Sequence, residues 1–165
     1  MASSMVELIS LLSENEKVLG ELAFALSEEQ RCIVDLDLGR LTENGVMKEE
    51  ITARLMKVRE ECRAVMKQAG SELGLKEISS MSILIAASTT ADQRKLHPLQ
   101  QRLMRLAQAL ERQHDLNRRM LENSIGLIKS SMALFSRLLG GCDTYGASGQ
   151  ISSGRSRGSI LRQEI

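Results

Sequence analysis

The chain has 165 residues and a net charge of +1, which suits a single domain of ordinary size. It contains two phenylalanines, one tyrosine, no tryptophan and one proline. A β-sandwich or barrel needs many turns and draws on aromatic and β-branched residues, so this composition argues against both. Leu, Met, Ala, Glu, Gln, Lys and Arg dominate instead, and these good helix formers predict an all-α fold.

The same numbers disfavour several partners and compartments. A net charge near zero gives no global field that attracts nucleic acid or an anionic membrane, and scarce aromatic residues give no platform for base stacking. No purely apolar run is longer than that at 83–87, which is far shorter than the roughly 20 residues of a membrane span. The N-terminal stretch lacks the positive start of a signal peptide. Three widely spaced cysteines without a C-x-x-C suit a reducing cytosol, so we expect a cytoplasmic protein.

The first predicted element is a long helix near residues 3–37. Positions that alternate in steps of three and four from Met5 to Leu36 are apolar at eight of ten places, as on one face of an amphipathic helix. Phe24 lies one step off this pattern, and we expect it to belong to the core.

The apolar pattern then changes phase. It slips between Leu36 and Leu41, close to Gly39 and the Asn44-Gly45 pair, and continues to residue 69. Asn-Gly favours a turn, but no strand pattern flanks it. The sequence therefore leaves two alternatives: a kinked continuous helix, or a brief break followed by a helix to about residue 69.

Residues 75–88 lead to the last long helix and fit either a short helix or a short strand. Thr90 and Gln93 then have the form of a capping box. Pro98 follows, so the last helix begins either near residue 90 with a kink or near residue 97 with Pro98 in its first turn. The apolar pattern continues to residue 139.

The composition changes after residue 139. Residues 140–165 hold six of the twelve glycines and several serines, with no helical period. A segment this polar buries too little surface to offset its ordering entropy, so we expect it to be disordered on its own. The predicted organisation is a bundle of three long antiparallel helices over residues 1–139, followed by a flexible tail over residues 140–165.

The second half of the last helix carries a surplus of apolar residues. Two apolar patterns run side by side and cover well over half of its circumference, whereas one is enough for packing in an antiparallel bundle. Either this half lies in the centre of a bundle, or it is a surface that binds an amphipathic helix of another protein. A chain with only three long helices has few side chains that could cover both apolar patterns, so we favour the partner surface. Its candidate residues are Leu121, Ile125, Leu127, Ile128, Met132, Leu134, Phe135, Leu138 and Leu139.

Catalytic and metal motifs are weak by comparison. Glu111-x-x-His114 places both side chains on one helix face, but di-iron bundles use this pair twice, together with two further glutamates. Cys32 and Cys62 lie at or near apolar positions, where a thiol behaves as a small hydrophobe. No phosphate-binding GxxxxGK[ST] loop is present. We expect no enzyme activity, no metal and no cofactor, and a helical metalloenzyme is the weakest alternative.

The tail contains the segment DTYGASGQISSGRSRGSI, residues 143–160, which resembles the C-terminal tail of FlgN-type flagellar export chaperones. Upstream, DLNRRMLENSIGLI (115–128) is similar to that family's asparagine-containing final helix, and LSEEQRCIVDLDLGRLTENG is similar to its first helix. The Asn44-Gly45 pair departs from the charged helix formers usual there. The matching tail positions are Thr144, Tyr145, Gly146, Gly149, Gln150 and Ser152, with Arg157, Gly158 and Ile160 further on.

This resemblance implies a cytosolic, non-enzymatic chaperone of the flagellar type III export system. Its expected clients are the hook-associated proteins FlgK and FlgL of the hook–filament junction, whose terminal helices it would bind and deliver to the export gate. The resemblance places the client site toward the C-terminal helix. It places docking to the cytoplasmic domain of the gate protein FlhA at Tyr145, with Gly146 and Gly149 beside it, and makes the export ATPase complex a further expected partner.

A function of a different class fits the same apolar patterns. A coiled-coil structural or adaptor protein would use them to self-associate, so a homo-oligomer remains an alternative.

Overall fold

The computed structural model describes residues 2–75 and 80–139, without the side chains of residues 2, 3 and 139. Four helices make up this part of the chain, and none of its residues forms a strand, which confirms the predicted all-α class. The tail predictions at Tyr145, Gly146 and Gly149 lie outside the described residues.

The chain divides into two units, Met1–Leu121 and Glu122–Ile165. The expected boundary after residue 139 borders the undescribed tail and stays a prediction. The helices are α1 (Ala2–Asp35), α2 (Leu38–Glu72), α3 (Met81–Ala87) and α4 (Thr90–Leu139).

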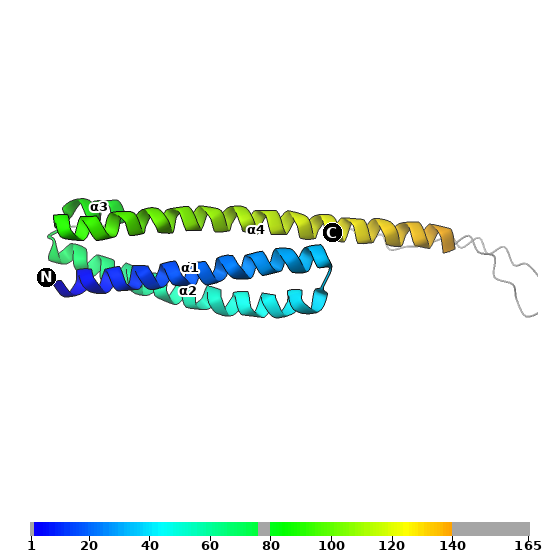
Figure 1. Cartoon of the computed structure of the whole chain (residues 1–165), viewed down its shortest axis with the longest axis horizontal. Helices are drawn as coiled ribbons and strands as arrows, with labels where there is room; N and C mark the ends of the chain where they lie inside the picture. The colour runs from blue at the N-terminus through cyan, green and yellow to red at the C-terminus, as the bar shows by residue number, and fades with distance from the viewer. Residues whose placement is uncertain (1, 76–79, 140–165) are drawn as a thin grey trace, which may run out of the picture. The chain divides into compact units, whose positions relative to one another are not determined.

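The predicted apolar patterns form the core of the first unit. Helices α1 and α2 run side by side in opposite directions, and α4 up to Leu121 contributes to the same core (Figure 1). One cluster joins the N-terminal half of α1 to α2, α3 and the start of α4. Its buried members are Met5, Leu8, Leu12, Cys62, Val65, Ala69, Leu84, Ile85, Leu96 and Leu99. The second cluster lies further along and consists of Val18, Leu19, Ala25, Leu26, Ile51, Leu55 and Leu110.

The phase slip of the sequence is a break between two helices. Leu36 has a φ of 54°, in the left-handed region, immediately after α1 ends. The backbone N–H of Leu36 donates to Ile33 O (3.3 Å), and that of Asp37 donates to Cys32 O (3.0 Å). This is the Schellman pattern that ends many helices, with leucine where glycine is usual. Of the two alternatives left by the sequence, the brief break is therefore correct.

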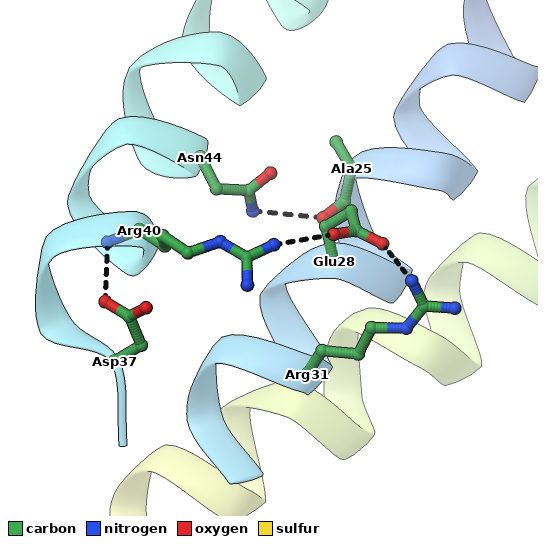
Figure 2. A network of polar contacts seen from close by, with 6 residues as sticks. All are labelled: Ala25, Glu28, Arg31, Asp37, Arg40 and Asn44. Carbon is green, nitrogen blue, oxygen red and sulfur yellow. Dashed lines mark hydrogen bonds and ion pairs between the residues drawn. The ribbon is translucent and has the colours of Figure 1, made fainter. Parts of the chain in front are cut away.

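A network of polar contacts holds the ends of α1 and α2 together (Figure 2). Asp37 caps α2, because its carboxylate accepts a hydrogen bond from the Arg40 backbone N–H at 3.0 Å. The Arg40 guanidinium reaches back to Glu28 at 3.3 Å. Asn44 is buried inside α2 and donates from Nδ2 to Ala25 O at 3.0 Å. The Asn44-Gly45 pair thus forms no turn, since its asparagine finds a partner across the helix pair.

One core prediction is wrong. Phe24 is 64% exposed. It lies two residues before the buried Leu26, which places it about 200° around the helix from that side chain. An aromatic residue one step off the apolar pattern therefore faces outward here.

Helix α2 ends at Glu72, slightly beyond the predicted end near residue 69. Gly74 has a φ of 74°, and Leu75 N–H donates to Gly70 O at 2.9 Å, which is a second Schellman pattern. The connection that follows contains the short helix α3 rather than a strand.

Helix α4 begins at Thr90 and passes through Pro98, so its start near residue 90 is confirmed. The capping residue is Thr89, one place earlier than predicted. Its hydroxyl donates to Asp92 Oδ2 at 2.7 Å and accepts from the Asp92 backbone N–H at 3.3 Å.

The strained position Leu36 gives a first prediction. We expect Leu36→Gly to raise the free energy of unfolding by about 0.5 kcal/mol, measured by urea denaturation. Relief of about 1–2 kcal/mol of left-handed backbone strain exceeds the roughly 0.4–1 kcal/mol of entropy that glycine adds to the unfolded chain. The exposed Leu36 side chain contributes little packing. Met56→Gly, at an exposed position inside α2, is the control and should lower stability by about 1 kcal/mol. A lower free energy of unfolding in both variants would contradict the assignment of backbone strain to Leu36.

Candidate partner-binding surface

Asn117 joins α4 to α1. It is 1% exposed, and its Nδ2 donates to Leu26 O and to Glu29 Oε2, each at 2.8 Å. Gln113, one turn earlier, donates to Asn117 Oδ1 at 3.0 Å and to Gln30 Oε1 at 2.9 Å. These contacts fix the rotation and the register of α4 on α1 up to the end of the first unit.

Glu29 is the charged centre of this network. It is buried, and its carboxylate forms an ion pair with Lys48 of α2 while it accepts the bond from Asn117. Glu29, Lys48 and Asn117 are polar members of otherwise apolar helical patterns, and their positions in the sequence predict no common role. In the sequence, these residues are visible only as one polar residue in the apolar pattern of each of three helices. The fold brings the three side chains together.

A second polar contact ties α1 to α4 nearer the start of both helices. Arg102 donates to Glu16 from Nε (2.6 Å) and from Nη2 (3.1 Å), in the two-pronged geometry typical of arginine and carboxylate. The hydrogen bond from Arg102 holds the pKa of Glu16 below its ordinary value, against the opposing effect of burial. Glu16 therefore favours folding in its ionised form, and that contribution is lost when the pH falls through its lowered pKa.

The candidate binding residues of α4 lie mostly in water. Leu121 is half-buried, and the side chain of Leu139 lies outside the described residues. The remaining seven, which we call the α4 stripe, are between 51% and 70% exposed. They are Ile125, Leu127, Ile128, Met132, Leu134, Phe135 and Leu138. No described residue covers them, so within the described part of the chain this half of α4 is not the centre of a bundle.

The α4 stripe has two ridges. Ile125, Ile128, Met132 and Phe135 follow alternating steps of three and four, and Leu127, Leu134 and Leu138 form the neighbouring ridge. At 100° per residue the two ridges occupy about half of the circumference, less than the predicted share of well over half. The opposite face is polar and includes the exposed residues Asn123, Lys129, Ser130 and Arg137. This amphipathic surface can bury a helix of another protein, but it presents no arrangement for chemistry.

The other candidate chemical groups are not assembled into a site. Glu111 and His114 are exposed on α4, and the described part of the chain contains no group of three or more His, Cys, Asp or Glu residues placed to hold a metal ion. Cys32 and Cys62 are buried and unpaired, as expected. Burial raises the pKa of the Cys62 thiol, and the nearby Glu61 charge adds to this effect, so the thiol is a poor nucleophile. No helix among the described residues is long and apolar enough to cross a membrane.

Comparison with known proteins gives one family. The family model described as FlgN protein matches residues 1–153. This span includes all four helices, the α4 stripe and the tail positions Tyr145, Gly146 and Gly149. No curated protein and no solved structure matches the chain.

Asn117 gives the prediction of this subsection. We expect Asn117→Ala to lower the free energy of unfolding by about 2–3 kcal/mol, because Leu26 O and the Glu29 carboxylate would then be buried without this donor. Asn123→Ala changes an exposed asparagine on the same helix and should leave stability within about 0.5 kcal/mol. Equal effects of the two substitutions in thermal or urea unfolding would show that the network does not anchor α4.

Proposed function

The chain belongs to the FlgN family, and we propose that it is a cytosolic export chaperone of the bacterial flagellum. In this proposal the α4 stripe binds terminal helices of hook-associated proteins, FlgK and FlgL, and the complex is delivered to the export gate. The observation that carries the proposal is the run of seven exposed apolar side chains on α4, in a chain whose family model covers residues 1–153. The proposal assigns no catalytic residue, metal or cofactor to the chain.

The chemistry of the α4 stripe suits such clients. Burying a leucine, isoleucine or phenylalanine side chain contributes about 1.5–3 kcal/mol, so seven exposed residues offer a large driving force to a partner. A terminal helix that later joins a coiled coil has an apolar face without a partner until assembly. The two ridges on α4 form a surface on which such a helix can lie. The apolar side chains of the client helix, spaced in steps of three and four, would pack between the ridges.

Burial rather than charge should drive this binding. The α4 stripe itself contains no charged side chain, and Lys129 and Arg137 lie on the other face of the helix. Salt screens attraction between exposed charges but not apolar burial, so client binding should change little with ionic strength. Such binding differs from an electrostatically steered encounter, whose rate falls steeply with added salt.

The tail supplies the second half of the proposal. We place docking to the cytoplasmic domain of FlhA at Tyr145, with Gly146 and Gly149, and we include the export ATPase complex among the partners. The resemblance of residues 143–160 to the family's tail supports this assignment. A polar segment that orders only on binding gives modest affinity and ready release, which a chaperone that must surrender its client requires.

The first unit serves as the support for these sites. We infer that α1, α2 and α4 up to Leu121 form the antiparallel three-helix bundle expected from the sequence, with α3 on its connection. The two core clusters shared by these helices support this arrangement.

The α4 stripe gives a client-binding prediction. We expect Leu134→Ala combined with Phe135→Ala to weaken binding to the terminal segments of hook-associated proteins about a hundredfold, because two anchors of about 1.5 kcal/mol each are lost. Binding would be followed by gel-filtration shift and titration calorimetry. Met104→Ala combined with Leu116→Ala removes two exposed apolar side chains elsewhere on α4 and should leave binding unchanged.

Two results would contradict this assignment. One is the absence of any shift with the unmodified chain. The other is light scattering that shows a permanent oligomer whose α4 stripe is buried between copies, which would favour the self-associating coiled-coil protein instead.

The tail gives a separate prediction. We expect Tyr145→Ala to leave client affinity unchanged and to lower secretion of the clients in a flagellated cell, because docking and client binding use different residues. Tyr145→Phe keeps the ring and should retain part of the export. Equal losses of client binding and export in Tyr145→Ala would refute a separate docking role.

A further inference from the structure

An open groove lies between α1 and α2, away from the α4 stripe. Two cavities of about 500 and 200 Å³ share Phe24 and Met47 in their linings and so adjoin along one surface. We call it the α1–α2 groove. Its apolar lining includes Gly20, Phe24, Met47 and Ile51. Phe24 and Met47 are 64% and 48% exposed, so no described residue covers the groove.

The groove lies on a different face of α1 from the contacts with α4. Asn117 bonds to Leu26 and Glu29, whereas Phe24 is about 200° around the helix from Leu26. A pair of antiparallel helices has a groove on each face, and α4 packs against one of these two faces. Gly20 opens the other, because a Cβ added there would meet nothing within 4 Å.

The charges around the groove are predominantly acidic. Inter-helix ion pairs lie toward both ends, Arg54 with Glu21 and Arg40 with Glu28. Glu43 and Glu50 also line the groove. Neither forms an ion pair with any residue that the structure describes. The lining therefore has two more carboxylates than guanidiniums.

We propose that the α1–α2 groove binds a basic amphipathic helix of a partner protein. The lining runs along α1 from Gly20 to Cys32, about 18 Å or three helical turns, which matches a helix of about twelve residues. Apolar side chains one turn apart would enter the two cavities, and lysine or arginine beside them would pair with Glu43 and Glu50. The exposed ion pairs at the ends are weak and can exchange partners.

This second site does not depend on the export function, because it uses no residue of the α4 stripe or the tail. It gives the chain a surface for a second partner whose recognition is electrostatic as well as apolar.

Two synthetic peptides test the proposal on the full chain. Both have about twelve residues and the same leucine spacing, and one has lysine and the other glutamate at the flanking positions. Methionine methyl NMR reports the place of binding. We expect the lysine peptide to shift the Met47 signal and to leave that of Met104 unchanged, and the glutamate peptide to leave the Met47 signal unchanged. A shift of Met132 instead of Met47 would place the peptide on the α4 stripe and overturn the proposal.

Substitutions in the groove sharpen the test. Gly20→Leu fills the depression and improves helix propensity, so it should abolish the Met47 shift in a folded chain. Gly45→Leu is the matched control, because it also enters open space in a helix but does not line the groove. Glu43→Lys combined with Glu50→Lys should weaken the lysine peptide about tenfold, equivalent to about 1.4 kcal/mol, and allow the glutamate peptide to bind. Undiminished lysine-peptide binding in either groove variant would overturn the proposal.

Discussion

A buried carboxylate constrains how the helices of the first unit pack. Glu29 is in the apolar pattern of α1, and burial of an ionised carboxylate costs several kcal/mol unless its charge and its hydrogen-bonding capacity are matched. Lys48 of α2 supplies the charge, and Asn117 of α4 supplies a donor. Each partner occupies a position of its own helix where an apolar residue would otherwise be expected. Sliding any one helix along the others would leave the carboxylate without a partner, so one register is selected, as a buried polar residue does in a coiled coil.

Two apolar surfaces of the described residues are exposed to water. One is the α4 stripe, and the other is the α1–α2 groove, where Phe24 and Met47 are exposed. The two surfaces differ in chemistry. The α4 stripe is a convex, uncharged pair of ridges on a single helix, whereas the groove is a concave site between two helices with an excess of acidic side chains. They therefore suit partners of different charge, and occupation of one requires no residue of the other.

Most of the secondary structure could be predicted, because the apolar spacing is regular and the chain has few breakers. The break at Leu36 was visible as a phase slip, but its position was not, since leucine at a left-handed position gives no sequence signal whereas Gly74 does. The Asn44-Gly45 pair pointed to a turn that does not exist, because Ala25 O lies across the helix pair as a partner for Asn44. Local preference was overruled there by a tertiary contact.

The candidate surfaces were harder to predict than the helices. The second apolar pattern of α4 was evident, but a pattern looks the same whether another helix covers it or water does, so only the fold distinguishes the two interpretations. The groove at Phe24 was missed because it requires the relative rotation of α1 and α2, which depends on contacts between residues distant in sequence. The three-way contact of Glu29, Lys48 and Asn117 was missed for the same reason.

The continuity of α4 has a consequence for how its exposed half is folded. Forming the first turn of a helix is unfavourable, so a segment such as 122–139 on its own would first have to form this nucleus. Here the turns before Leu121 are already ordered by contacts with α1 and provide the nucleus, from which each further residue adds a hydrogen bond. The stripe residues are thus held at helical spacing before a partner arrives. Association then carries a smaller entropic penalty, and dissociation leaves behind a helix rather than a coil.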